Sequence, residues 1–169
     1  IRTLDLDEVN KLGEGVKAIA LTDERWDKVD IKTTNLIPNI LAQTKAEKKF
    51  AYTAMLFRDG ICTEGATSNV FAVKDGILYT HPADNHILKG ITRQMIVTRV
   101  APSLGITLIE KEFDRTFVDE ADELFFTDTI GGVIPIIKLD KNPVSGGKPG
   151  HVTLRLREAL EKLMEEGLP

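Results

Sequence analysis

The sequence predicts a mixed α/β (α+β) fold, in which helices pack on a mixed β-sheet. Short apolar segments meet at two tight turns, Asp59-Gly60 and Asp75-Gly76, which is the pattern of β-hairpins. Longer segments with apolar residues at helical spacing stand next to these hairpins. Hairpins placed beside helices in this way argue against a run of repeated βαβ units.

Composition bounds the size and class of the protein. The chain has 169 residues, one ordinary domain or slightly more, and 42% of them are apolar, enough for a sizeable core. The net charge of -4 excludes the basic footprint of a nucleic-acid-binding protein. No apolar stretch approaches the roughly 18 residues of a membrane span, and the lone Cys62 fits a reducing compartment. We therefore expect a cytoplasmic protein with no nucleic-acid or membrane partner.

The first half of the chain predicts one helix among several strands. The strands cover residues 15–21, 51–57, 61–63, 69–73 and 77–80. The helix is expected to start after Asn35, a suitable N-cap, and to run to about Lys49. Its apolar residues at helical spacing are Leu36, Ile37, Ile40 and Leu41.

The second half predicts two longer helices, a short one and three strands. The first long helix covers residues 92–104 and stops at Gly105. Its apolar positions are Met95, Ile96, Val97, Val100, Ala101 and Leu104, and those of the final helix are Val152, Leu156, Leu160 and Leu163. The strands cover residues 106–109, 124–126 and 133–137, the short helix 117–121, and a Gly- and Pro-rich loop 142–150.

Lys32 is the first candidate for chemistry. It is one of 14 lysines, and taken alone it would be a solvated surface charge. However, it follows Val29-Asp30-Ile31 at the end of a predicted strand, where side chains emerge at the rim of a sheet. The polar residues 33–35 that follow can satisfy a buried amine. A lysine in a desolvated pocket loses its proton more readily, which suits a Schiff-base nucleophile.

Glu64 is the second candidate. It lies one residue beyond a predicted strand and before Gly65, so a polar loop residue is the alternative interpretation. As a functional group, its carboxylate would keep a pyridine nitrogen protonated and make the ring a better electron sink. Thr67 and Ser68 either form hydrogen bonds to the cofactor that carries this pyridine ring or cap the strand that follows.

Gly90-Ile91-Thr92 opens a predicted helix, where free amide groups and the positive end of the helix dipole favour a phosphate. The alternative is a simple N-cap by Thr92. Between two apolar strands, the hydroxyls of Thr127-Asp128-Thr129 either complete a phosphate cup or belong to an ordinary turn. In a cup, the carboxylate of Asp128 has to point away from the phosphate.

The histidines predict no metal site. His81, His86 and His151 lack metal-ligand spacing with Cys62 or with one another.

In their order along the chain, these segments resemble the fold-type IV pyridoxal 5'-phosphate (PLP) enzymes. That family includes D-amino acid aminotransferase, branched-chain amino acid aminotransferase and aminodeoxychorismate lyase. The resemblance covers nearly the whole chain, and its specific segments are residues 30–35, 58–60, 63–65, 68–71 and 87–93. The Asp-Ile-Lys-Thr-Thr-Asn and Ser-Asn-Val-Phe segments lean toward the D-amino acid aminotransferase branch. Residues 127–132 depart from the Ser/Thr-rich segment expected in that branch.

The resemblance implies a role for each candidate residue. Lys32 is similar to the catalytic Schiff-base lysine, Glu64 to the partner of the pyridine nitrogen, and Leu88 to the residue that packs on the ring face. The remaining cofactor-binding residues that the resemblance implies are Thr67, Gly90, Ile91, Thr92 and Thr129.

The function implied by the resemblance is ping-pong transamination between an amino acid, with D-alanine favoured, and a 2-keto acid. Lys32 would move the alpha proton, and the protein would form a homodimer with its active site near the interface. A branched-chain aminotransferase, an aminodeoxychorismate lyase and an inactive module on the same fold stay open as alternatives.

The resemblance also implies that the chain is one part of a larger protein. Residues 1–169 would be the PLP-binding C-terminal domain, with a barrel-like sheet at its core. The smaller N-terminal domain of the family would be absent, and with it a phosphate-binding arginine and a tyrosine near the ring hydroxyl. The start at Ile1 agrees with this expectation. We expect the chain alone to bind PLP weakly and to be largely inactive.

Overall fold

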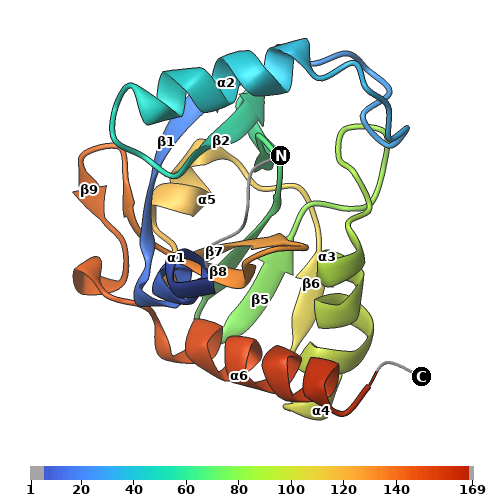
Figure 1. Ribbon diagram of the computed structural model, residues 1–169, viewed down its shortest axis with the longest axis vertical. Coiled ribbons are helices and arrows are strands. Elements are labelled where there is room, and N and C mark those ends of the chain that lie inside the picture. The colour runs from blue at the N-terminus through green and yellow to red at the C-terminus, as the bar shows by residue number, and fades with distance from the viewer. Residues whose placement is uncertain (1–5, 168–169) are drawn as a thin grey trace.

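One curled, mixed sheet dominates the molecule, as the computed structural model of residues 6–167 shows (Figure 1). Its strand order is β3-β2-β1-β8-β7-β4-β5-β6, with β9 beside β8. The strands are β1 Val16–Thr22, β2 Thr53–Arg58, β3 Ile61–Gly65, β4 Asn69–Lys74, β5 Ile77–Thr80, β6 Leu108–Glu110, β7 Glu123–Asp128, β8 Gly132–Leu139 and β9 Asn142–Pro143. The predicted mixed α/β fold is therefore confirmed.

Both predicted hairpins are present. The β2–β3 and β4–β5 pairs are antiparallel, whereas β1 runs parallel to both of its neighbours, β2 and β8. The turn residues Asp59 and Gly60 have φ values of 50° and 83°, and Asp75 and Gly76 have 52° and 75°. Two consecutive left-handed residues match the twist of a hairpin, which explains the Asp-Gly pair in each turn.

Helices lie around the curled sheet. They are α1 Leu6–Lys11, α2 Ile37–Glu47, α3 Ile91–Met95, α4 Ala101–Ser103, α5 Arg115–Asp119 and α6 His151–Glu165. Short 3-10 turns cover Leu12–Glu14 and Ser145–Gly147, and a π-helical segment, Ile96–Val100, joins α3 to α4. None of the helices described within residues 6–167 is long and apolar enough to cross a membrane.

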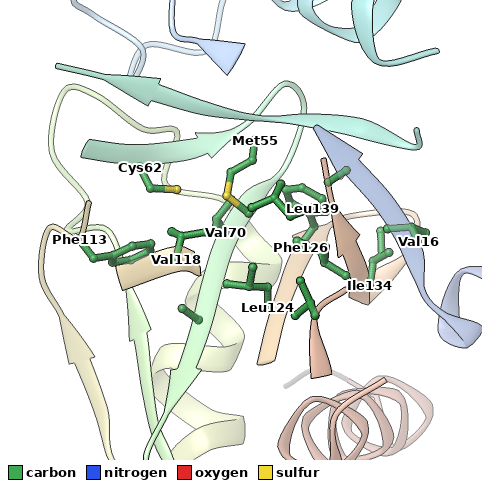
Figure 2. Close-up of a cluster of buried hydrophobic side chains, with 14 residues drawn as sticks. Val16, Met55, Cys62, Val70, Phe113, Val118, Leu124, Phe126, Ile134 and Leu139 are labelled. Atoms are coloured by element: carbon green, nitrogen blue, oxygen red, sulfur yellow. The ribbon is translucent and has the colours of Figure 1, made fainter. Parts of the chain in front are cut away.

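The main core lies inside the curl of the sheet. Figure 2 shows Met55, Val70, Leu124 and Phe126 meeting there from three different strands, β2, β4 and β7. All four side chains are at most 2% exposed, so this interior is closely packed and excludes water. The core holds the strands at fixed positions, and the loops between them can therefore build a site.

The helix predicted at residues 92–104 is real, but it is not uniform. α3, the π-helical segment and α4 follow one another without a break over residues 91–103. Ile96 and Val100 are buried, as the apolar spacing predicted, and they lie in one cluster with Leu156 and Leu160 of α6. Gly105 has a φ of 65° directly after the helix, which confirms it as the stop.

The predicted helix α2 is present, but the apolar residues that indicated it do not form its buried face. Leu36, Ile37, Ile40 and Leu41 are 47%, 68%, 61% and 52% exposed, and the helix packs on the sheet through Ala42 and Ala46. Small alanine side chains allow the helix to lie close to β1 and β2, which the larger residues would prevent. Asn35 is not the N-cap, because the helix begins at Ile37 after Leu36.

Candidate active site

The eight predicted site residues line a single pocket of about 240 Å³. It lies between the loop of residues 23–36, the β3–β4 connection, the start of α3 and the turn after β7. The residues brought together are Lys32, Glu64, Thr67, Leu88, Gly90, Ile91, Thr92 and Thr129. These segments are far apart in the sequence, so the pocket is a product of the fold.

Lys32 lies on a loop, and the predicted strand before it is absent. β1 ends at Thr22, and the loop is held instead by hydrogen bonds from Val29 N–H to Asn85 O (2.9 Å) and from Ile31 N–H to Lys28 O (3.1 Å). The side chain of Lys32 is exposed in the part of the chain that the structure describes, so the expectation of a desolvated amine is wrong. Alternating apolar residues 29 and 31 suggested a strand, but within the described part of the chain no neighbouring strand pairs with them.

Glu64 lies within β3, whereas the sequence had suggested a position one residue beyond the end of the strand. The residue is only 4% exposed, and its carboxylate is fully engaged. It accepts hydrogen bonds from Asn69 Nδ2 (2.8 Å) and Leu88 N–H (3.0 Å), and it pairs with Arg25 Nη1. These contacts fix the carboxylate at the pocket, between β3 and the segment that leads into α3.

Burial raises the pKa of Glu64 to about 7, although Arg25 and the Leu88 N–H act to lower it. A carboxyl group with this pKa exchanges its proton close to neutral pH. A basic ring nitrogen placed against it would share that proton, so the environment suits a carboxylate that acts on a heterocycle.

Arg25 belongs to the site, although little in the sequence pointed to it. Its side chain is 4% exposed, and besides pairing with Glu64 it contacts Asp23 through Nε–Oδ1 (2.8 Å) and Nη2–Oδ2 (2.7 Å). Nη2 also lies 3.3 Å from His86 O. Burial alone would raise the pKa of Asp23, but the bonds from Arg25 outweigh it and hold that pKa below its usual range. The only sequence signal for Arg25 is the spacing Asp23-x-Arg25, which lets the two side chains reach each other.

The start of α3 also lines the pocket. Gly90 is the N-cap, and the first intrahelical bond runs from Gln94 N–H to Gly90 O. The amides of Ile91 and Thr92 precede that bond and are the groups that a phosphate could use. A Cβ at Gly90 would clash with Asn69 Oδ1, so a glycine is required for this close approach.

Thr92 is not the N-cap that the alternative interpretation predicted. Its hydroxyl donates to Asp128 O at 2.9 Å and thereby ties the start of α3 to the turn after β7. The carboxylate of Asp128 is engaged elsewhere, because it accepts from the amides of Ile130 (2.9 Å) and Gly131 (2.6 Å) and from the Tyr52 hydroxyl (3.3 Å). The carboxylate of Asp128 is thus hydrogen-bonded within its own turn, while the neighbouring Thr129 is exposed at the pocket.

Two buried hydroxyls at the pocket suggest that a polar ligand belongs there. Ser68 and Thr127 are among the lining residues, but Ser68 Oγ and Thr127 Oγ1 are inaccessible to solvent and have no hydrogen-bond partner among the described residues, so each would have to rotate toward the pocket to meet a ligand. A buried hydroxyl without a partner costs about 1–3 kcal/mol, which a bound phosphate or ring hydroxyl would recover. An amine, a buried carboxylate, a helix N-terminus and free hydroxyls together form a donor set that fits PLP.

Substituting Glu64 by glutamine is expected to remove a pH dependence of stability. The folded-state pKa of about 7 lies above the ordinary value of 4.5, so the folded protein binds this proton more tightly. The stabilisation that this proton contributes is therefore fully present below pH 4.5 and is lost as the pH rises toward 7. Relative to Glu64→Gln, the unfolding free energy of the unsubstituted protein should fall by about 3 kcal/mol across this window.

Urea unfolding of the cofactor-free protein from about pH 4.5 to about pH 8 measures this difference. Glu47→Gln, on the exposed face of α2, is the matched control and should follow the unsubstituted protein at each pH. The loss of charge next to Arg25 adds a constant offset to Glu64→Gln. A difference that stays constant over the whole pH range would contradict the raised pKa.

A curled mixed sheet thus carries a lysine, a buried carboxylate and a helix start on one pocket. Residues 6–139 match the family described as Amino-transferase class IV, and the chain belongs to that family.

The relatives agree with this assignment. The chain is 42% identical over 154 residues to a D-alanine aminotransferase of Staphylococcus aureus (strain COL), covering 91% of this chain and 54% of that protein. It is 40% identical over 147 residues to the D-alanine aminotransferase of Bacillus licheniformis, covering 87% and 52%. The chain thus spans about half the length of the curated relatives it matches.

Solved structures show the same fold. The branched-chain aminotransferase of Thermoproteus uzoniensis with norvaline superposes with a TM-score of 0.83 at 31% identity, over 89% of this chain and 52% of that one. The branched-chain amino acid aminotransferase of Thermobaculum terrenum in its PLP form gives 0.82 at 26% identity, over 92% and 53%. The predicted fold-type IV aminotransferase family is therefore confirmed.

Proposed function

We propose that this chain forms the PLP-binding part of an aminotransferase that moves an amino group between an amino acid and a 2-keto acid. The observation that carries the proposal is the convergence of Lys32, Glu64 and the start of α3 on one pocket. Each of these groups alone can also be explained by a structural role that involves no cofactor. Together they supply an amine, a proton-holding carboxylate and an anion site at three sides of one small ligand.

Each part of the pocket has a separate task in this proposal. Lys32 would hold the cofactor covalently through Nζ, and the amides of Ile91 and Thr92 would bind its phosphate, with Thr129 as a further donor. Leu88 would pack on the ring face, and Thr67 would add a polar contact. When bound, PLP supplies an aldehyde for attachment and an electron-withdrawing ring.

Proton handling would be divided between two residues. Glu64, held in place by Arg25, Asn69 and the Leu88 amide, would keep a proton at the ring nitrogen. Lys32 Nζ, freed when the amine of the substrate takes its place, would accept a proton from the alpha carbon of the substrate and pass it to the cofactor carbon. The exposed loop that carries Lys32 gives its amine the freedom to reach both positions.

D-alanine is the proposed amino donor. The support is the 42% identity to a D-alanine aminotransferase, set against 31% and 26% to two branched-chain aminotransferases of known structure. Because the chain spans about half of these relatives, we propose that residues 1–169 are the cofactor domain and that a further domain selects the substrate. Alone, the chain is expected to bind PLP weakly and to turn over little.

Assembly and location remain proposals as well. A homodimer is supported by the exposed apolar residues of α2, because an interface between two chains would cover them. Leu36, which directly precedes these residues, also lines the pocket, so such an interface would lie beside the site. The cytoplasmic location stays a prediction, which rests on the lone Cys62, buried and unpaired in the core.

The decisive experiment supplies the whole protein with PLP, D-alanine and 2-oxoglutarate, and measures pyruvate and glutamate. Transamination forms both products in equal amounts and forms pyruvate only when the keto acid is present. Release of pyruvate from aminodeoxychorismate without an acceptor would instead identify the lyase. A preference for L-leucine or L-valine would identify a branched-chain enzyme, and no reaction with any of them would favour the inactive module.

A further inference from the structure

A cluster of metal-ligating side chains lies outside the pocket, in the loop that follows β5. His81, Asp84 and His86 each offer one ligand atom, and these three atoms all lie within 4.8 Å of one another. The sequence predicted no metal site, because the histidines lacked a familiar spacing. That expectation overlooked Asp84, and it overlooked how tightly the loop folds: Asp84 N–H donates to Pro82 O (2.9 Å) and His86 N–H donates to Asp84 Oδ1 (2.8 Å).

The distances within the cluster are close to those of a coordination site. Asp84 Oδ1 lies 3.5 Å from His86 Nδ1 and 3.8 Å from His81 Nδ1. Ligand atoms that bind one ion tetrahedrally at about 2.0–2.1 Å are about 3.3 Å apart. The two distances to Asp84 would need to shorten by a few tenths of an ångström, whereas the two histidine ligand atoms, which lie within 4.8 Å of each other, would have to approach by up to about 1.5 Å through side-chain rotation. The two imidazole rings stand edge to face, with centroids 6.2 Å apart, so neither blocks the other.

Solvent reaches one side of the cluster. The His81 side chain is 2% exposed, whereas Asp84 and His86 are each 35% exposed. An ion could enter past the two exposed ligands and keep a water molecule in its remaining position. His81 Nδ1 also lies 2.9 Å from Pro82 O, so an ion bound at this nitrogen would take the place of that contact.

We propose that His81, Asp84 and His86 form a binding site for a divalent transition-metal ion of the Zn²⁺ type. Two imidazoles and one carboxylate suit Zn²⁺, Co²⁺ or Ni²⁺, whereas Mg²⁺ and Ca²⁺ prefer oxygen ligands throughout. The site does not depend on the proposed aminotransferase function, because none of its ligands lines the pocket.

The same loop contacts residues that line the pocket, which gives the ion a structural effect. His86 O accepts from Arg25 Nη2 at 3.3 Å, and Asn85 O accepts from Val29 N–H at 2.9 Å in the loop that carries Lys32. Leu88 N–H donates to Glu64 at 3.0 Å. An ion that fixes residues 81–86 would restrict both segments, so it stabilises the folded protein and orders the pocket.

Zn²⁺ titration of tag-free, chelator-treated whole protein tests the site by calorimetry. We expect one ion per chain, with affinity lowered at least about tenfold in His86→Asn and in Asp84→Asn. His151→Asn is the matched control, because His151 is exposed at the start of α6 and outside the cluster. Mg²⁺ should not bind measurably, and Zn²⁺ should raise the melting temperature of the unsubstituted protein and of His151→Asn.

Co²⁺ provides a second, spectroscopic readout of the same ligand set. Visible absorption bands of four-coordinate Co²⁺ should appear in the unsubstituted protein and be absent in His86→Asn. If His86→Asn does not fold, Asp84→Asn decides, since an asparagine there keeps an oxygen that can accept from His86 N–H. Equal Zn²⁺ affinity in the Asp84 variant and the His151 control, or no binding at about 100 micromolar Zn²⁺, would overturn the proposal.

Discussion

Replacing Lys32 by alanine is expected to lower amino transfer by the whole protein at least about 10³-fold, because no other amine of the described pocket can hold the cofactor and move the proton. The fold should remain intact. Lys32 is exposed, and within residues 6–167 its side chain makes no hydrogen bond or ion pair, so the change in unfolding free energy should stay within about 0.5 kcal/mol.

Borohydride reduction in the presence of PLP gives an independent measurement. Mass spectrometry of the digested protein should find the pyridoxyl group on the peptide that contains Lys32. Lys32→Arg keeps the charge and should be as inactive as alanine, whereas Lys49→Ala, an exposed lysine after α2, should retain full activity and labelling. Label on a different lysine, or unchanged activity in Lys32→Ala, would refute the assignment.

Replacing Arg25 by methionine should be the most destabilising single change at the site, at about 3–5 kcal/mol. The guanidinium is buried between Asp23 and Glu64, whose side chains are 0% and 6% exposed. Without it, two carboxylates are left in a dry environment with fewer donors, and each must either take up a proton or disturb the packing around it. Urea unfolding at neutral pH measures the loss.

A double substitution separates charge from packing. Arg25→Met combined with Glu64→Gln should cost clearly less than the sum of the two single changes, because the second substitution removes one of the charges that the first left unpaired. Lys45→Met is the surface control. Lys45 pairs with Glu24 at 3.3 Å, but both side chains are more than half exposed, so the cost should be at most about 1 kcal/mol. Additive effects at Arg25 and Glu64 would contradict the coupling.

Local patterns were sufficient for most of the fold. Asp-Gly pairs located both hairpins, apolar spacing located α6 and the helix that begins at Ile91, and Gly105 marked the end of the latter. These signals depend on backbone conformation and on residues a few positions apart, which a sequence displays directly. The buried face of α2 was missed because both faces contain apolar residues, and the choice between them depends on the distance to the sheet.

The site was predictable as a set of residues and not as an arrangement. The motifs around Lys32, Glu64 and Gly90 were recognisable, and the fold places all three on one pocket. Arg25 was not recognisable, because its partners Glu64 and His86 lie 39 and 61 residues away. The grouping of His81, Asp84 and His86 was not recognisable for a different reason, since these residues are close in sequence but only the folded loop turns them toward one point.

By itself, the sequence determined the class of fold, most of its elements and the chemical groups of the pocket, because these depend on residue type and short-range spacing. Only the tertiary structure decided the environment of those groups. It left Lys32 on an exposed loop, raised the pKa of Glu64 by burial, and surrounded it with Arg25, Asn69 and the Leu88 amide. Burial and long-range pairing depend on which distant segments meet, and packing of the curled sheet is what brings them together.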